Sequence, residues 1–215
     1  MKQSYDWYFD FISPFSYLQW IRLRRDFPEF KINPKPILFA AMLKHWGQLG
    51  PAEIPGKRIH TYRMLIWQAR ELNIPFRFPP AHPFNPLPAL RLALAAKNIH
   101  QACDLIFKHI WEEGLAADSA EALQPIADQL AIENLAASLA DPEVKTRLSQ
   151  NGEQAIALEI FGVPTLVINR HLFWGNDATP FAMEYLANPS LIDVDKEMLA
   201  IDDLPPAMQR NIAKQ

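Results

Sequence analysis

The sequence has 215 residues, of which 49% are hydrophobic and 21% are charged, a composition typical of a folded globular chain. The formal net charge of -3 gives no electrostatic basis for nucleic-acid binding, and the apolar stretches are too short to cross a bilayer. The N-terminus has no apolar signal core, so we expect a cytoplasmic protein without nucleic-acid or membrane partners.

The first forty residues predict a strand, a helix and a second strand. Residues 5–12 are rich in aromatic side chains and partly alternate, which indicates a strand. Ser13 is a favoured N-cap and Pro14 suits the first helical position, so a helix is expected over residues 15–27. Residues 31–38 predict another strand, and the two prolines within it favour either the edge of a sheet or an irregular strand.

The middle of the chain predicts helices alone, with no strand between residues 40 and 160. A proline-rich segment between residues 75 and 88 indicates a rigid, irregular connection. Apolar residues recur at helical spacing in five segments, residues 57–72, 87–99, 101–113, 119–131 and 143–160.

The last part returns to strands. Residues 165–169 and 171–174 predict two short strands around a tight turn at Asn169 and Arg170. Asn176 and Asp177 are expected to cap a helix over residues 178–187. The polar segment after Ser190 predicts either a poorly ordered tail or a short docking helix.

This order of elements predicts an α/β protein, and it fits a thioredoxin-like fold with an inserted all-helical subdomain. We expect residues 1–46 and 135–190 to form the discontinuous thioredoxin-like domain. Residues 47–134 would form the helical insertion, and residues 191–215 a C-terminal tail.

A first candidate site is Ser13-Pro14-Phe15-Ser16, between the first strand and the first helix. Thioredoxin-like enzymes place Cys-x-x-Cys at this junction, because a helix N-terminus stabilises a thiolate. Serine cannot exchange disulfides, but its hydroxyl can donate a hydrogen bond to the thiolate of another molecule. Ser13 could instead be a simple N-cap; a hydroxyl can serve both roles, because it has one proton and two lone pairs.

A second candidate is the segment Gly162-Val163-Pro164-Thr165, directly before a predicted strand. It suggests a cis proline, and the Val163 backbone could then pair with an extended, peptide-like ligand. The alternative is an ordinary trans turn.

A third candidate comprises Trp174, Gly175, Asn176 and Asp177. A helix start presents N–H groups to a carboxylate, while Asp177 could receive an ammonium group. A free amino acid carries both groups, a carboxylate and an ammonium, so this segment could bind one. The alternative is an ordinary helix cap.

Other residue types exclude several chemistries. Cys103 is the single cysteine, so an intramolecular disulfide and a cysteine-based zinc site are excluded, and we expect this side chain to be buried. The histidines have no metal-binding spacing, so no metal is expected. Trp46, Trp67 and Trp111 could line an aromatic pocket, but core packing is the favoured interpretation.

Together, three stretches resemble the family of 2-hydroxychromene-2-carboxylate isomerases and kappa-class glutathione transferases, a DsbA-like branch of the thioredoxin fold. They are YFDFISPFSYL over residues 8–18, FGVPT over residues 161–165 and FWGND over residues 173–177. The resemblance extends over most of the chain and is weaker between residues 40 and 135.

The resemblance implies that glutathione is the cofactor and that Ser13 contacts its sulfur. It implies that Val163, before Pro164, pairs with the cysteinyl backbone of glutathione. The γ-glutamyl end would be received by four residues, Trp174, Gly175, Asn176 and Asp177.

For the second substrate, the resemblance implies a site between the thioredoxin-like part and the insertion, where Lys57 and Asn85 are candidates. Lys57 could equally be a solvated residue at a helix start. The implied activity is isomerisation of aromatic enone or chromene carboxylates in aromatic catabolism, by a homodimer.

Two alternatives stay open from the sequence. The chain could be a glutathione transferase acting on other electrophiles, or a glutathione- or peptide-binding module without catalysis. A thiol-disulfide oxidoreductase is disfavoured, because Ser13 and Ser16 occupy the two cysteine positions.

Overall fold

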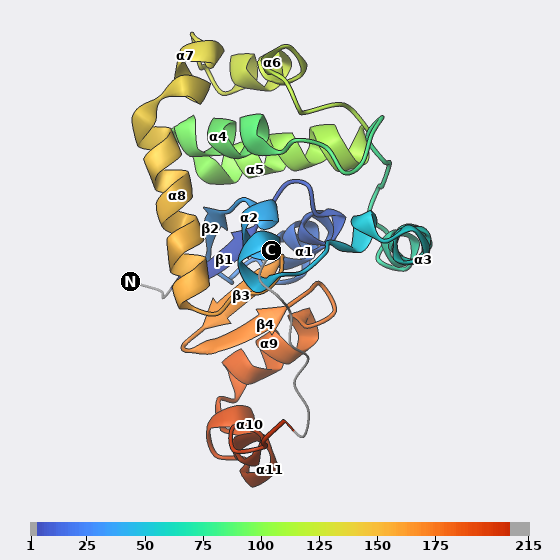
Figure 1. Cartoon of the computed structure of the whole chain (residues 1–215), viewed down its shortest axis with the longest axis vertical. Helices are drawn as coiled ribbons and strands as arrows, with labels where there is room; N and C mark the ends of the chain where they lie inside the picture. The colour runs from blue at the N-terminus through green and yellow to red at the C-terminus, as the bar shows by residue number, and fades with distance from the viewer. Residues whose placement is uncertain (1–3, 207–215) are drawn as a thin grey trace.

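The computed structural model describes residues 4–206 and contains a four-stranded mixed sheet among them (Figure 1). The strand order is β2-β1-β3-β4; β1 is parallel to β2 and antiparallel to β3, and β4 is antiparallel to β3. The strands are β1 (Tyr5–Phe9), β2 (Ile32–Pro36), β3 (Thr165–Ile168) and β4 (His171–Trp174). The predicted α/β class is therefore confirmed, as is the edge position of β2.

Helix α1 (Pro14–Asp26) connects the parallel strands β1 and β2. It begins where the sequence predicts, because the Ser13 side chain accepts a hydrogen bond from the Ser16 N–H and Pro14 follows at the first helical position.

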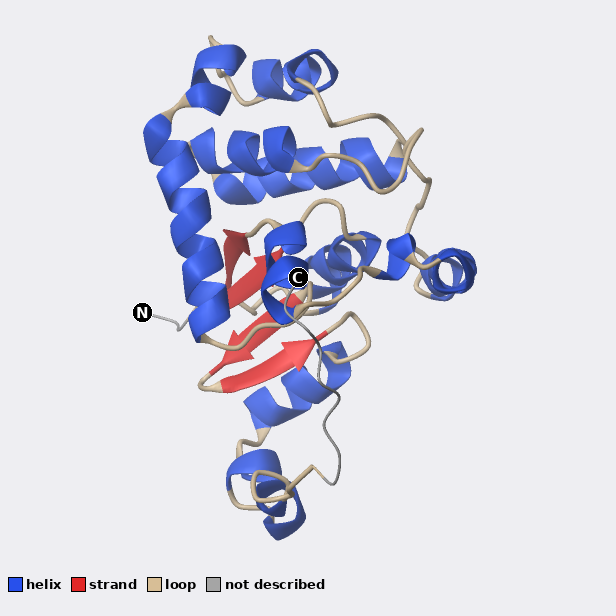
Figure 2. Cartoon of the chain, in the orientation of Figure 1, coloured by secondary structure: helices blue, strands red, loops and turns tan. Residues whose placement is uncertain are grey.

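Residues 39–157 contain only helices and their connections (Figure 2). In Figure 1, α4 to α7 lie above the sheet, α8 runs from them back down beside it, and α3 lies at one side. No helix within residues 4–206 is long and apolar enough to span a membrane. In chain order these elements are α2 (Phe39–Trp46), η1 (Pro51–Glu53), α3 (Pro55–Glu71), α4 (Leu87–Ala95), α5 (Ile99–Phe107), η2 (Lys108–Glu112), α6 (Ala120–Gln129), α7 (Leu135–Ala140) and α8 (Pro142–Ala157).

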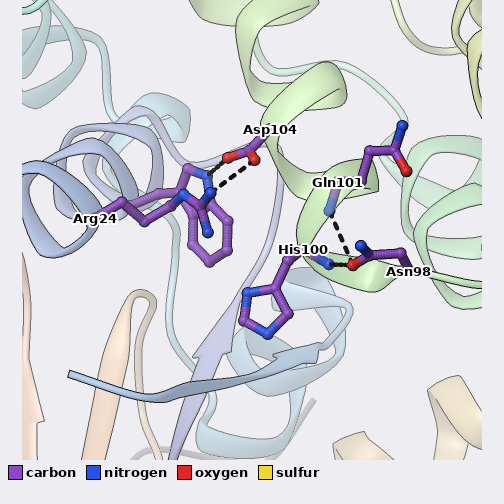
Figure 3. Close-up of polar contacts among 6 residues, drawn as sticks. Arg24, Asn98, His100, Gln101 and Asp104 are labelled. Atoms are coloured by element: carbon purple, nitrogen blue, oxygen red, sulfur yellow. Dashed lines mark hydrogen bonds and ion pairs between the residues drawn. The ribbon is translucent and has the colours of Figure 1, made fainter. Parts of the chain in front are cut away.

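Two of these helices, α2 and α7, were not predicted, and the predicted boundary between α4 and α5 is wrong. The helix expected over residues 87–99 ends at Ala95. The Asn98 side chain accepts hydrogen bonds from the His100 and Gln101 N–H groups and so begins α5 at Ile99 (Figure 3).

The C-terminal part forms the predicted hairpin and a helix below the sheet, α9 (Thr179–Ala187). The expected side-chain cap from Asn176 and Asp177 is wrong, because no side chain caps this helix. The Asn176 carbonyl instead accepts a hydrogen bond of 2.7 Å from the Thr179 hydroxyl.

Two short helices follow, α10 (Ser190–Asp193) and α11 (Lys196–Ala200). Of the two alternatives for this segment, the helical one is therefore correct up to residue 200. The rest of the predicted tail from residue 207 onward lies outside the described residues.

One hydrophobic core joins the sheet to the helices above it. Aromatic rings from β1 and the following turn pack on Phe107 of α5, with Phe11 at a centroid distance of 4.7 Å. Cys103 is fully buried as predicted, and so is Trp111. Trp67 is exposed, contrary to its predicted core position. This single core contains residues of both the thioredoxin-like part and the segment 47–134, so packing does not divide the two. The proposed domain boundaries therefore stay a prediction.

Asp104 on α5 fastens that helix to α1 (Figure 3). Its carboxylate accepts a hydrogen bond of 2.8 Å from the Trp20 indole N–H and forms an ion pair of 3.0 Å with Arg24. The indole is fully buried, whereas both side chains of the ion pair are about two-fifths exposed. The hydrogen bond to the indole therefore contributes more to stability than the ion pair.

We expect Asp104→Ala to lower the free energy of unfolding by about 1–3 kcal/mol, because it leaves the buried indole N–H without its acceptor. The matched variant Arg24→Ala leaves the indole hydrogen bond intact and removes the ion pair and the guanidinium that lies 5.1 Å from the centre of the Trp20 ring. Because Arg24 is about two-fifths exposed, this variant should cost no more than about 1 kcal/mol. Urea denaturation of both variants measures the difference. Equal losses would contradict this assignment.

Candidate functional site

Ser13 lies buried at the start of α1, close to a segment 150 residues further along the chain. The Ser13 Oγ accepts a hydrogen bond of 3.3 Å from the Ser16 N–H. The same hydroxyl points its proton at the Val163 carbonyl oxygen, 3.5 Å away. The second distance is at the upper limit for a hydrogen bond, so the hydroxyl proton is held only weakly. It can therefore be donated to a ligand.

The Val163–Pro164 peptide bond is cis, as the sequence suggested. The Pro164 carbonyl accepts a hydrogen bond of 2.8 Å from the Gly175 N–H. All three candidate segments thus meet at one end of the strands, where β1 ends and β3 begins. Ser13, Val163, Pro164 and Gly175 are brought together.

Two polar groups at this end of the strands have no partner among residues 4–206. They are the Val163 N–H and the buried hydroxyl of Ser16. A buried polar group without a partner is costly, and a ligand that pairs with it removes that cost. The Val163 N–H is the group that an extended peptide-like ligand would use.

Trp174 is 52% exposed, and its indole ring lies against Gly162, next to the Val163–Pro164 segment. A Cβ atom on Gly162 would lie 2.3 Å from the indole nitrogen, so only glycine permits this close approach. Phe161 packs edge-on against the same ring at a centroid distance of 5.1 Å. The result is a small exposed aromatic surface, made by Phe161 and Trp174, beside the Val163–Pro164 segment.

The turn after Trp174 is fixed from behind by α1. Gly175 has a φ of +92°, a conformation that favours glycine. Its carbonyl accepts a hydrogen bond of 2.9 Å from the side chain of Gln19, which in turn accepts one from the Trp7 indole. These contacts place the peptide groups of the turn independently of any ligand.

Asn176 is buried, and its side-chain oxygen accepts a hydrogen bond of 3.1 Å from Arg22. Arg22 also donates to the Asn176 carbonyl at 2.8 Å. Asp177 is exposed, so its carboxylate faces solvent. Asp177 is therefore the residue of this segment that can receive an ammonium group, whereas Asn176 holds the turn.

Lys57 and Asn85 are both exposed, and no described contact joins either of them to Ser13. Their segments nevertheless reach the site through Tyr62 and His82. One ring nitrogen of His82 bonds the Ile12 carbonyl at 2.8 Å, and the other bonds the Tyr62 hydroxyl on α3. Since a carbonyl can only accept, the Ile12-facing nitrogen bears the proton. Burial lowers the pKa of His82 and so favours its neutral form.

Asp10, three residues before Ser13, was not identified from the sequence. Its carboxyl is fully buried and accepts hydrogen bonds from the Ile12 N–H at 3.0 Å and the Phe39 N–H at 2.9 Å. Burial raises the pKa of Asp10 to about 7, although the backbone hydrogen bonds oppose the shift. The sequence does contain a signal for this buried carboxyl, because Asp10 directly follows a strand of aromatic residues.

A family of known proteins has the same arrangement. The model of the DSBA-like thioredoxin domain matches residues 6–187, which include all of the four strands except Tyr5, and the helical block of residues 39–157. The chain belongs to the DSBA-like thioredoxin family. The predicted thioredoxin-like fold with its helical insertion is thereby confirmed.

Within this DSBA-like family, the chain is similar to proteins of the branch that its motifs resemble. It is 30% identical to the 2-hydroxychromene-2-carboxylate isomerase of Pseudomonas putida, over 80% of this chain and 88% of that protein. It is 26% identical to glutathione S-transferase kappa 2 of Caenorhabditis elegans, over 85% and 91%. A solved 2-hydroxychromene-2-carboxylate isomerase superposes with a TM-score of 0.74 at 24% identity, over 90% of this chain and all of the other. The chain's relatives are thus enzymes.

The titration of Asp10 gives a testable prediction for this DSBA-like chain. Because its folded pKa of about 7 lies above the ordinary value, it stabilises the fold fully at acid pH and loses that contribution as the pH rises through 7. Relative to Asp10→Asn, the wild-type free energy of unfolding should fall between about pH 4 and pH 7, by at most about 1.4 kcal/mol per unit. Denaturant unfolding across this range measures the difference. A pH-independent difference would rule out the raised pKa.

Proposed function

We propose that the chain binds glutathione between the start of α1 and the Val163–Pro164 segment, and uses it to isomerise aromatic enone or chromene carboxylates. The observation behind this proposal is the weakly held Ser13 hydroxyl at a helix N-terminus, facing a backbone with an unpaired N–H. The isomerase and transferase relatives support it.

The described residues offer partners for two parts of the tripeptide, the cysteinyl residue and the γ-glutamyl end. The Val163 backbone offers an N–H to the cysteinyl residue, beside Pro164. Trp174 offers an exposed ring, Gly175 a fixed turn, and Asp177 a free carboxylate for the γ-glutamyl ammonium. Asn176 acts indirectly, through its hydrogen bonds with Arg22.

Ser13 and the helix start can keep the bound sulfur deprotonated without a catalytic base. A free thiol has a pKa of about 8.5. A helix N-terminus contributes roughly 0.3–1 kcal/mol, and a hydrogen bond to a charged group about 1.5–3 kcal/mol. At about 1.4 kcal/mol per unit, these terms lower the thiol pKa by roughly one to three units. Thiolate is then a major species at neutral pH.

When bound, glutathione supplies a nucleophilic sulfur for reversible addition to an electron-poor carbon, which frees a double bond to rotate. Ser13 orients that sulfur by its hydrogen bond. Lys57 would pair with the substrate carboxylate, and Asn85 would hydrogen-bond a substrate oxygen.

The kappa-class relative supports a second candidate, a glutathione transferase acting on other electrophiles at the same site. The two activities share the sulfur site and differ in whether the adduct is released. We propose the cytoplasm as the compartment, because the glutathione pool is kept reduced there. A homodimer is the proposed assembly.

Ser13→Ala should raise the pKa of bound glutathione, seen as loss of thiolate absorbance in the ultraviolet, together with loss of turnover. This substitution also removes the cap of α1, at a cost of about 1 kcal/mol. Ser13→Gly is the matched control, because glycine caps nearly as well but has no hydroxyl. Both variants should lose the thiolate, and only Ser13→Ala should lose appreciable stability. Retained absorbance and turnover in both would refute the serine role.

Lys57→Ala should raise KM for an aromatic enone carboxylate, with little effect on KM for glutathione, because it removes the cation proposed to pair with the substrate carboxylate. Lys57→Arg should keep most of the affinity. Lys97→Ala, another exposed lysine, is the control for a general change in charge. Steady-state kinetics with each substrate varied in turn distinguish the variants. An unchanged KM would show that Lys57 is a solvated residue.

A further inference from the structure

The peptide group that joins Ile12 to Ser13 is held at both of its polar ends. Its carbonyl oxygen lies 2.8 Å from a ring nitrogen of His82, and its N–H donates a hydrogen bond of 3.1 Å to the Asp10 carbonyl. Because a peptide group is planar, these two bonds together fix the orientation of the whole group. The group directly precedes the Cα atom of Ser13, so it sets the direction in which the Ser13 side chain leaves the backbone.

The Ser13 hydroxyl depends on this backbone more than on its own contacts. It lies 3.5 Å from the Val163 carbonyl oxygen and 3.3 Å from the Ser16 nitrogen. Both distances exceed the usual range for a hydrogen bond. A group that is to act on a ligand atom must be placed to within about 0.5 Å. Whatever fixes the peptide group before Ser13 therefore also places its hydroxyl.

The His82 ring is in turn fixed by Tyr62 of α3. The phenol hydroxyl contacts two atoms of His82, the second ring nitrogen and, at 3.1 Å, the carbonyl oxygen. A neutral imidazole has one N–H and one lone pair, so the hydroxyl donates to the lone pair and the N–H is left for the Ile12 carbonyl. Trp111 packs edge-on against the same ring at a centroid distance of 5.4 Å. Tyr62 thus fixes both the orientation and the tautomer of the ring.

The proline-rich segment supports His82 through the backbone. Three prolines lie within three residues of His82, and each of them restricts its own φ to about −65°. The segment is also anchored near its start, where the Arg77 N–H donates a hydrogen bond of 2.7 Å to the Trp111 carbonyl. The irregular connection that the sequence predicts is therefore a rigid support for one side chain.

We propose that His82 is a positioning residue, which holds the Ile12 carbonyl so that the Ser13 hydroxyl faces the glutathione sulfur. Tyr62 supports this role by holding the His82 ring. The role rests on the proposed function, because His82 acts through Ser13 and not on the reacting atoms. The same contacts join α3, which carries Lys57, to the turn that carries Ser13. The sites proposed for the substrate carboxylate and for the sulfur are thereby kept in a fixed relation.

The first variant is His82→Leu, which removes both ring nitrogens and keeps an apolar side chain. It should raise the pKa of bound glutathione, seen as loss of thiolate absorbance in the ultraviolet. It should also lower kcat by roughly tenfold to a hundredfold, because the hydroxyl is no longer aimed at the sulfur. KM for glutathione should change little, since the Val163 backbone and Asp177 are unaltered. A loss confined to kcat distinguishes misplacement of the hydroxyl from damage to the binding site.

Two milder variants test the same contacts with less risk to folding. In His82→Gln, the side-chain nitrogen is separated from the Cα atom by as many bonds as histidine Nε2 and can donate to the Ile12 carbonyl. This variant should recover most of the thiolate absorbance and kcat. Tyr62→Phe keeps the aromatic ring but loses the hydroxyl, so it should show a loss smaller than that of His82→Leu.

The matched control is His109→Leu. The buried ring of His109 also bonds a carbonyl, that of Ala116 at 2.7 Å, within the helical block. The control should therefore lose stability in urea without raising the pKa of bound glutathione. Hydrogen exchange of the Ser13 amide, followed by NMR without glutathione, gives a measurement that does not depend on the sulfur. Exchange should be faster in His82→Leu than in a His109→Leu protein of comparable stability.

Several outcomes would overturn the role of His82. They are wild-type thiolate absorbance and kcat in His82→Leu, a His82→Gln variant no better than His82→Leu, and an equal effect in His109→Leu. Unchanged exchange of the Ser13 amide in His82→Leu would do so even where Ser13→Ala loses the thiolate. Retained thiolate in both Ser13→Ala and Ser13→Gly would instead refute the glutathione proposal, while the exchange rates would still show whether His82 holds the peptide group.

Discussion

The antiparallel pairing of β1 with β3 is the constraint on which the site depends. Its register places Tyr8 opposite Thr165, so the residues that follow β1 lie beside the residues that precede β3. Ser13 and Val163 therefore meet although 150 residues separate them. A shift of one residue would turn the side chains of β3 to the opposite face and would remove Leu166 and Ile168 from the core in which they are buried, so this burial fixes the register.

The helical block contributes to the site by holding the backbone just before Ser13. The Trp111 indole donates a hydrogen bond of 2.9 Å to the Phe11 carbonyl, and His82 bonds the carbonyl of Ile12. These two carbonyls would otherwise need water or a neighbouring chain. The block thus orients the turn that leads into α1.

The sequence predicts those parts of the fold that depend on contacts between residues close together in the chain. Ser13 at the start of α1 and Asn169 in the hairpin turn act within a few residues of themselves. Helix α2 was missed because its first N–H is bonded by Asp10, 29 residues earlier, while Leu38 provides no cap. The buried role of Asn176 was missed for the same reason, since it depends on Arg22.

Asp10 and Ser13 also explain why an anionic ligand would choose α1 over α2. Both helices begin beside the end of β1, and the start of each favours negative charge. At α2 that position is already occupied by the Asp10 carboxyl, which bonds the Phe39 N–H. At α1 the cap is the neutral Ser13 hydroxyl, which keeps a proton to donate. An aspartate in place of Ser13 would cap the helix equally well but repel a thiolate, so the pairing of helix start and hydroxyl favours an anion from outside the chain.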